Sequence, residues 1–316
     1  MSPATTTCAP LAPLAPAAIG AAAGADSARR PLSFDRPVSR ASVHKSADRE
    51  VLITDARQLT GDRYAVAARW SRNHLLGHRP EALTSDPLLL VETVRQAAIH
   101  LAHRFLDVPA GHPFVMQDLD FELLGDRLPG GGRAGLPVLL DATCVRRITG
   151  RRFRFALEAT LLVDGVRCAR MGVRWEVLPP APYALLRERA GYLAGAGPVG
   201  RPGPADRRDV LLTDDPALPH GSWRLLADPT HPVLFDHPCD HVPGTVLLEA
   251  LRQAAARAVP GWSPTDGRLV FHSFGEHHRE VTVSARVEDG RILTLATQDG
   301  RQVASALFNA RTVASC

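Results

Sequence analysis

The feature that most constrains this chain is a helical segment that occurs twice. Residues 86–98 read DPLLLVETVRQAA, and residues 244–255 read GTVLLEALRQAA. Each copy has a glutamate, an arginine three residues later and a glutamine four residues later: Glu92, Arg95 and Gln96, then Glu249, Arg252 and Gln253. At about 100° per helical residue these side chains share one arc, while apolar residues fill most of the remaining circumference. The pattern predicts two buried helices.

A buried carboxylate and a buried guanidinium cost free energy unless they pair or bind another group. Two interpretations of the repeated polar stripe therefore stay open. It forms either a structural ion pair in each copy or a functional site.

The repeat extends beyond the helix. His74 lies 18 residues before Glu92, and His231 lies 18 residues before Glu249. Further upstream, EVLITD at 50–55 is echoed by DVLLTD at 209–214. Three matches in the same order indicate an internal duplication.

Composition changes along the chain suggest the domain boundaries. Residues 1–40 are rich in Ala, Pro, Ser and Thr without periodicity, and we expect a disordered extension there. The first repeat is expected over 41–178 and the second over 207–316. The Pro- and Gly-rich stretch 179–206 between them reads as a linker with room for one short helix.

Each repeat has the pattern of an α+β module. Segments 51–59 and 63–71 are strand-like around a turn at 60–62, which predicts a hairpin. Asp86 and Pro87 suit the N-cap and first position of a helix that runs to about Phe105. Four strand-like segments follow, at 112–124, 136–148, 151–165 and 166–178, and the second half repeats this order. We expect an antiparallel sheet wrapped around a long central helix in each half.

Composition narrows the partners and the compartment. Five widely spaced cysteines without a CxxC pair are typical of reduced thiols in a cytoplasmic protein and provide no zinc-site spacing. The net charge of +4 comes mainly from scattered arginine. It favours an acidic carrier protein or a phosphorylated substrate, and no aromatic-interleaved basic stripe indicates nucleic acid. No apolar run reaches the roughly 18 residues that a membrane span needs.

Two side-chain clusters have alternative readings. His231, His237 and His241 lie near Asp236 and Asp240. One interpretation is a metal site, but the Pro-rich loop gives no regular ligand spacing, so we expect no metal. We favour a role for these residues at the mouth of an active site. Five arginines near Gly150 form either a solvated hairpin tip or a docking patch for an acidic carrier protein: Arg146, Arg147, Arg151, Arg152 and Arg154.

VPGTVLLEA at 242–250 resembles the active-site motif of hot-dog-fold hydroxyacyl-carrier-protein dehydratases and places Glu249 on their catalytic glutamate. The dehydratase histidine would fall on Phe235, which weakens that assignment. The same spacing from Glu92 lands on a histidine, His78, but without the Pro-Gly motif.

A second resemblance covers nearly the whole chain from about residue 45. DPLLLVETVRQA in the first half, HPVLFDHPCDHVPGTVLLEALRQA in the second and a VLxTD strand opening each half are similar to the A-factor synthase family, which is built of tandem hot-dog repeats. The resemblance implies transfer of a β-ketoacyl group from acyl carrier protein to dihydroxyacetone phosphate, in the biosynthesis of a γ-butyrolactone signal. It implies no cofactor beyond the phosphopantetheine arm that carries the acyl group.

Acyl transfer to an alcohol needs a base and hydrogen-bond donors for the oxyanion. We assign Glu249 and Arg252, with Glu92 and Arg95, as catalytic candidates, and expect the second repeat to be the active one. The substrate-binding candidates are Gln253, Gln96, Gly244, His231, His237, His241, His74 and His78. No serine or cysteine has a nucleophile setting, which favours direct transfer. A hot-dog thioesterase or dehydratase, and a non-catalytic acyl- or lactone-binding regulator, remain alternatives.

Overall fold

The computed structural model describes residues 31–79, 82–130, 135–149, 152–193, 208–237 and 239–311. Most of the expected N-terminal extension, linker residues 194–207 and Arg151 lie outside the described residues. Residues 33–38 lie alongside the first strand. The Ser33 N–H donates to Asp55 Oδ2 at 3.2 Å, and the Val38 N–H donates to the Ile53 carbonyl at 2.9 Å. Packed structure therefore begins before residue 41.

The first repeat contains every element expected from its sequence. The elements are η1 (Arg40–Val43), η2 (Asp48–Glu50), β1 (Ile53–Thr60), β2 (Arg63–Trp70), β3 (Thr84–Ser85), α1 (Pro87–Phe105), β4 (Phe114–Leu123), β5 (Leu128–Pro129), β6 (Leu136–Thr149), β7 (Arg152–Val163) and β8 (Val166–Val177). The hairpin, the helix bounds and the four long strands are confirmed. The Asp86 side chain caps α1 by accepting from the Leu88 N–H at 3.0 Å, as its sequence position predicts.

The linker contains the helix α2 (Pro180–Ala190), and the second repeat follows with its elements in the same order as the first. These elements are β9 (Leu212–Thr213), β10 (Ser222–Leu225), α3 (Gly244–Ala258), β11 (Asp266–Phe271), β12 (Thr282–Glu288), β13 (Arg291–Gln298) and β14 (Arg301–Asn309). The first two strands are much shorter than β1 and β2. The hairpin turns at Asp289-Gly290 and Asp299-Gly300 both have positive φ angles.

Twelve strands from both repeats join in one sheet, and β3 and β5 pair separately. Its order is β1-β2-β6-β7-β8-β4-β11-β14-β13-β12-β10-β9, so the second half mirrors the first about the β4–β11 pair. These two strands pair antiparallel, with Leu119 opposite Leu269 and Phe121 opposite Gly267. A side chain at Gly267 would have its Cβ 2.6 Å from the Phe121 ring, so this junction requires glycine.

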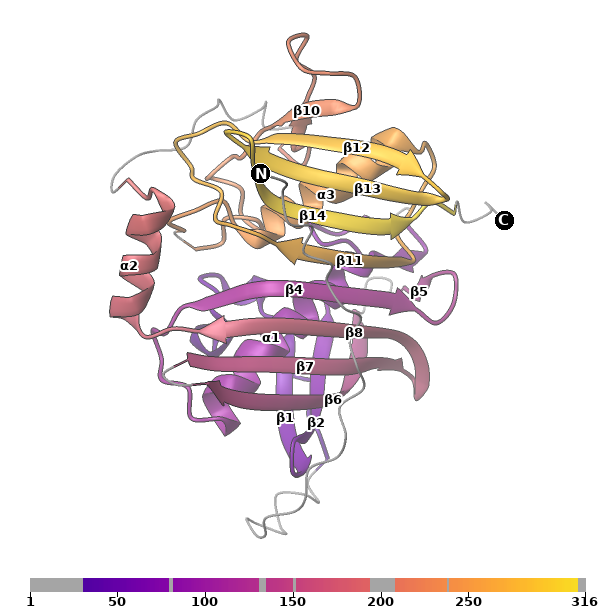
Figure 1. Ribbon diagram of the computed structural model, residues 1–316. Coiled ribbons are helices and arrows are strands. Elements are labelled where there is room, and N and C mark those ends of the chain that lie inside the picture. The colour runs from indigo at the N-terminus through magenta and orange to yellow at the C-terminus, as the bar shows by residue number, and fades with distance from the viewer. Residues whose placement is uncertain are drawn as a thin grey trace.

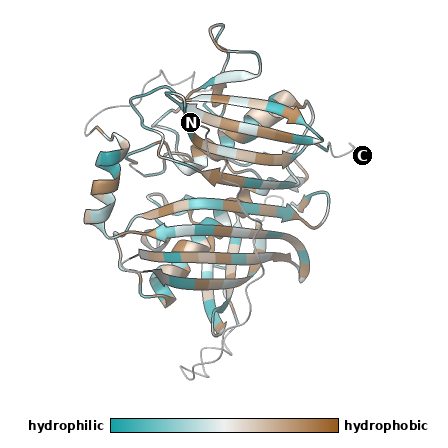
Figure 2. Cartoon of the chain, in the orientation of Figure 1, coloured by the Kyte–Doolittle hydropathy of each residue, from teal (hydrophilic) through white to brown (hydrophobic). Residues whose placement is uncertain are grey.

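The sheet curls around the two long helices (Figure 1). Residues along strands such as β13 alternate between buried and more exposed, and Figure 2 shows the corresponding alternation of hydropathy. α1 has fifteen buried residues among its nineteen, which confirms the prediction of a helix enclosed on nearly all sides. No helix among the described residues is long and apolar enough to cross a membrane.

Candidate active site

The predicted polar stripe of α1 forms a compact ionic cluster. Arg95 Nε donates to Glu92 Oε2, and Arg95 Nη2 and Gln96 Nε2 donate to Glu92 Oε1, each at 2.8 Å. Lys45 Nζ also lies 3.1 Å from Oε1. Burial alone would raise the pKa of Glu92, but Arg95 and Lys45 outweigh it and hold that pKa well below its usual range. Glu92 is therefore an ionised, fully hydrogen-bonded carboxylate, which is a poor general base.

The stripe of α3 repeats most of this pattern. Arg252 Nε donates to Glu249 Oε2 and Gln253 Nε2 to Glu249 Oε1, each at 2.8 Å. Gln253 also bonds the Asp209 carbonyl and the Leu211 N–H. In the first repeat Gln96 bonds the Glu50 carbonyl and the Leu52 N–H in the same way. Both glutamines thus fasten their helix to the segment before the first strand and orient the glutamate. Their hydrogen bonds among the described residues are to other parts of the protein, whereas the sequence suggests them as substrate-binding residues.

A cavity of about 840 Å³ lies between the two repeats. Lys45, Glu92 and Arg95 line it from the first repeat. The loop before α3 and the start of that helix line it from the second, with Asp236, His237, Cys239, Asp240, His241 and Gly244. Glu249 is not part of this lining and is fully buried. Of the two glutamates, Glu92 therefore lies beside this cavity, whereas the loop and helix start beside it belong to the second repeat, which we expected to be the active one.

His241 is held in this cavity wall by a carboxylate. Its Nδ1 lies 2.6 Å from Asp240 Oδ1, and an ionised carboxylate can only accept, so Nδ1 carries a proton. In the neutral form of the ring Nε2 is then an acceptor, and in the protonated form both nitrogens donate. Burial would raise the pKa of Asp240, but the His241 hydrogen bond and charge and then Arg187 lower it. This pair has the arrangement of a general base and the group that orients it.

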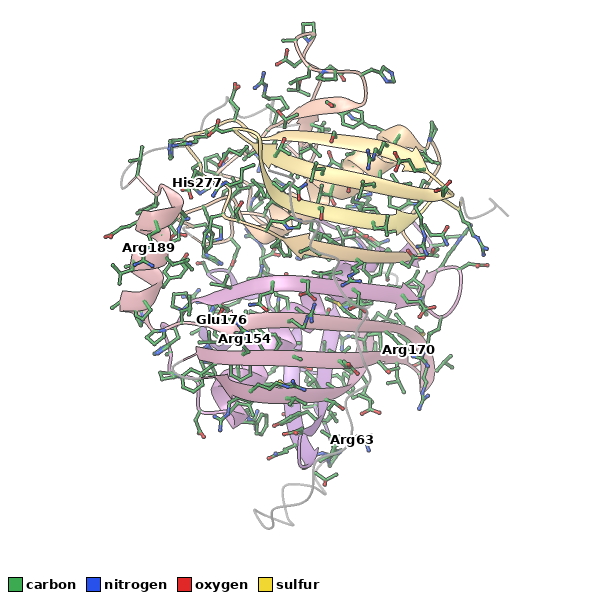
Figure 3. The ribbon with its side chains drawn as sticks, viewed as in Figure 1. Arg63, Arg154, Arg170, Glu176, Arg189 and His277 are labelled. Carbon is green, nitrogen blue, oxygen red and sulfur yellow. The ribbon has the colours of Figure 1, made fainter. Side chains whose placement is uncertain are left out.

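Asp240 is fixed in turn by the linker helix α2. Arg187 is 2% exposed, and its Nε donates to Asp240 Oδ2 at 2.9 Å while Nη1 donates to Glu276 Oε1 at 2.8 Å. Tyr183 Oη donates to Asp240 Oδ1 at 3.0 Å. Figure 3 shows Arg189 on the same helix and His277 on the loop beside it. The sequence interpretation missed Arg187, because nothing in a Pro-rich linker indicates that one of its arginines becomes buried.

The N-terminus of α3 supplies hydrogen-bond donors to the same cavity. Val246 N–H and Leu247 N–H both bond the Pro243 carbonyl. The N–H groups of Gly244 and Thr245 precede them, have no acceptor within the helix, and belong to residues that line the cavity. Paired amides at the positive end of a helix suit a developing oxyanion. Gly244, which the sequence suggests as a substrate-binding residue, therefore lies in the cavity wall.

The predicted histidines separate into two groups. His237 and His241 line the cavity, whereas His74, His78 and His231 do not. His74 Nδ1 accepts from the Leu76 N–H and its Nε2 faces Asp86 at 3.3 Å. His231 Nδ1 accepts from the N–H groups two and three residues later, and its Nε2 faces Asp209 at 3.3 Å. This matched pair orders the loop ahead of each helix, and His78 is exposed.

Lys45 is the second functional residue that sequence reasoning missed. It is the single lysine of the chain, and that count was the available signal. Within the described parts of the chain, no group of three or more His, Cys, Asp or Glu side chains could hold a metal ion.

The fold and this site define a double hot-dog protein with a composite cavity between its repeats. The chain belongs to the family described as the A-factor biosynthesis hotdog domain, whose model matches residues 27–179 and 199–316.

Similar proteins agree with this assignment. One from Streptomyces virginiae is 34% identical over 295 residues, covering 88% of this chain and 98% of that protein. One from Streptomyces coelicolor is 30% identical over 282 residues, covering 86% and 90%. Both are called 2-oxo-3-(phosphooxy)propyl 3-oxoalkanoate synthase. Among solved structures, the 12:0-ACP thioesterase from Umbellularia californica matches with a TM-score of 0.52 and 12% identity over 80% of this chain and 98% of that one, and shows the fold alone.

Proposed function

We propose that this protein transfers a β-ketoacyl group from an acyl carrier protein thioester to a hydroxyl of dihydroxyacetone phosphate. The product is a phosphorylated 3-oxoalkanoate ester on the route to a γ-butyrolactone signal, made in the cytoplasm without a cofactor beyond the carrier's phosphopantetheine arm. The names of the two relatives describe this ester. The observation that carries the proposal is a cavity lined by both a carboxylate-bound histidine and the amides at the start of a helix.

The residues support a direct transfer. His241 Nε2 takes the proton of the acceptor hydroxyl, and the hydroxyl oxygen attacks the thioester carbonyl carbon. The Gly244 and Thr245 N–H groups stabilise the oxyanion. Collapse of the intermediate breaks the C–S bond, and His241 returns the proton to the leaving sulfur.

The cavity walls fit an acyl chain. Most of the lining away from the polar groups is apolar and includes Leu75, Leu88, Val91, Ile99, Leu119, Leu247, Leu248 and Phe271. Such a surface favours an alkyl group over a polar one by about 0.8 kcal/mol per buried methylene.

Positive charge near the cavity suits a phosphate and an acidic carrier. Arg189 and Arg301 line the cavity with exposed side chains, and neither pairs with a carboxylate of the described residues. Arg154 belongs to the arginine cluster of the β6–β7 hairpin, and it lies opposite Glu176, near the point where β8 leads into α2 (Figure 3). Arg154 thus lies on the α2 side of the molecule, which supports the proposal that an acidic carrier docks there.

The experiment is incubation with a β-ketoacyl thioester and dihydroxyacetone phosphate, followed by mass spectrometry. We expect the phosphorylated ester, formed only when both substrates are present. Free acid released at the same rate without the acceptor would identify a thioesterase. Binding of the thioester without turnover would identify a non-catalytic binding protein.

A further inference from the structure

Lys45 is the single lysine in a chain whose lysines and arginines total 37. Its side chain is 5% exposed, lines the cavity and lies against Glu92. Lysine keeps a compact ammonium with three donors, whereas arginine presents a flat fork. A buried ammonium beside a substrate cavity is a costly arrangement unless it has a specific contact to make.

The segment that carries Lys45 is fixed from both repeats. His44 has a φ of 54°, a left-handed conformation that is strained for a residue with a side chain. The Lys45 N–H donates to the Arg40 carbonyl at 2.9 Å. The next two N–H groups, of Ser46 and Ala47, donate to the Asp236 carboxylate of the second repeat at 2.7 and 3.1 Å. Lys45 is thus positioned before any ligand binds.

The two ionic clusters differ at this position. Glu249 has the same arginine and glutamine partners as Glu92 but no lysine among its described contacts. Because Arg95 and Gln96 already satisfy Glu92, the lysine is not needed to neutralise that carboxylate. Its presence on the side with the cavity points to a ligand.

The chemistry of the cavity narrows the choice of ligand group. The two cations Lys45 and Arg95 are balanced by the two carboxylates Glu92 and Asp236, so this part of the wall suits a neutral dipolar group better than a phosphate dianion. The exposed Arg189 and Arg301 are the better phosphate partners. The free amides of α3 serve the thioester carbonyl. The remaining polar group of a β-ketoacyl substrate is the ketone at carbon 3.

We propose that the Lys45 ammonium donates a hydrogen bond to the 3-oxo oxygen of the acyl chain and so selects β-ketoacyl over saturated acyl thioesters. Lys45 is then a specificity-determining residue. This inference rests on the proposed acyl transfer, which supplies the substrate class.

The test compares kcat/KM for a 3-oxoacyl thioester and the saturated thioester of equal length. A hydrogen bond from a charged donor is expected to give the native protein a preference of about tenfold to a hundredfold. Lys45→Met should lose this preference because kcat/KM falls for the 3-oxo substrate alone. The kcat/KM for the saturated substrate should change by less than about threefold. Lys45→Arg should recover part of the preference. The matched control is Arg49→Met, which removes a cation that is 69% exposed on the same segment.

Several outcomes would overturn the inference. Equal use of both thioesters by the native protein would do so while leaving acyl transfer intact. So would a preference that survives Lys45→Met, or an equal loss on both substrates, which would indicate only a structural role.

A binding measurement remains informative even if no transfer occurs at all. Biosynthetic incorporation of ε-¹³C-labelled lysine labels the one lysine side chain of the protein without changing its ammonium group. Its resonance is expected to shift when an unreactive 3-oxoacyl thioester analogue binds, but not with the saturated analogue. Identical responses to both analogues would contradict the assignment.

Discussion

Glu92 and Glu249 have nearly identical partners, so their chemistry is set by what surrounds them. Glu92 accepts hydrogen bonds on both oxygens and has a lowered pKa, and it faces the cavity. In the proposed reaction Glu92 holds Arg95 and Lys45 in place, and His241 transfers the proton. Spacing within the sequence identified the two glutamates as a repeated pair but could not show which of them lies beside a cavity.

His241→Ala is expected to lower kcat for ester formation by about 10²- to 10⁴-fold, because it removes the general base. The native thermal midpoint should change little, since His241 lies partly exposed in the cavity wall. His278→Ala is the matched control, because His278 contacts only Arg279 among the described residues. Full activity of His241→Ala in steady-state assays would remove His241 from the mechanism.

Glu92→Gln and Glu249→Gln form a second pair of matched variants. Each leaves a largely buried cation without its carboxylate, so each should lose about 3–5 kcal/mol of unfolding free energy. Only Glu92→Gln should also lower the turnover of the folded protein, because only Glu92 lines the cavity. Denaturant titration combined with specific activity separates the two effects, and inactivation by Glu249→Gln alone would reverse the assignment.

Among the elements, α2 links the repeats to the catalytic pair. Arg187 is its single buried residue and bridges Glu276 and Asp240. The helix also contributes Tyr183 to the same carboxylate. A segment that reads as a linker in sequence is therefore a structural part of the site.

Arg187→Met should destabilise the fold by about 3–5 kcal/mol, because the buried Glu276 carboxylate and the partly exposed Asp240 carboxylate lose their cation. It should also lower kcat more than it raises KM, since Asp240 is no longer held against His241. Arg189→Met changes a neighbouring exposed arginine and should leave stability unchanged. A stable Arg187→Met protein with native kcat would show that α2 does not position the base.

The contact of α1 with η1 predicts a pH dependence of stability. His100 Nδ1 lies 3.1 Å from Ser42 Oγ, and burial and then the charge of Arg104 lower the His100 pKa to about 4. Between pH 6.5 and 4 the unfolded chain binds the proton that the folded one does not, so the unfolding free energy falls as the pH falls. The slope from this residue is at most about 1.4 kcal/mol per pH unit.

Urea titrations of the native protein and His100→Gln between pH 7.5 and 5 measure this contribution. The variant should show a shallower slope in this range. The low-pKa carboxylates Glu92 and Asp240 lose their stabilising contribution only at lower pH, so they do not obscure it. Parallel slopes in the two proteins would contradict the effect.

The elements themselves were largely predictable from local patterns. The alternation in 136–178 and the capped helix at Pro87 follow from period and capping chemistry, which are encoded within short windows. The union of both halves through β4 and β11 was not predictable, because strand pairing between distant segments leaves no local signal. The same holds for Arg187 and Lys45, whose importance arises from contacts across the fold.

At the scale of the whole molecule, the mirrored strand order places each ionic cluster near the loop of the other repeat. The negative charge of Asp236 helps to raise the pKa of Arg95, and that of Asp86 helps to raise the pKa of Arg252. Duplication thus produced two equivalent positions, and the described cavity lies at one of them. The central claim is that one composite site, built around Glu92 and completed by the second repeat, binds the acyl thioester.

Calorimetric titration with an unreactive β-ketoacyl thioester analogue tests this claim most directly. The native protein should bind one equivalent per chain, Glu249→Gln should retain that site, and Glu92→Gln should weaken it at least tenfold. Two equivalent sites in the native protein, or a site lost in Glu249→Gln and kept in Glu92→Gln, would contradict the account.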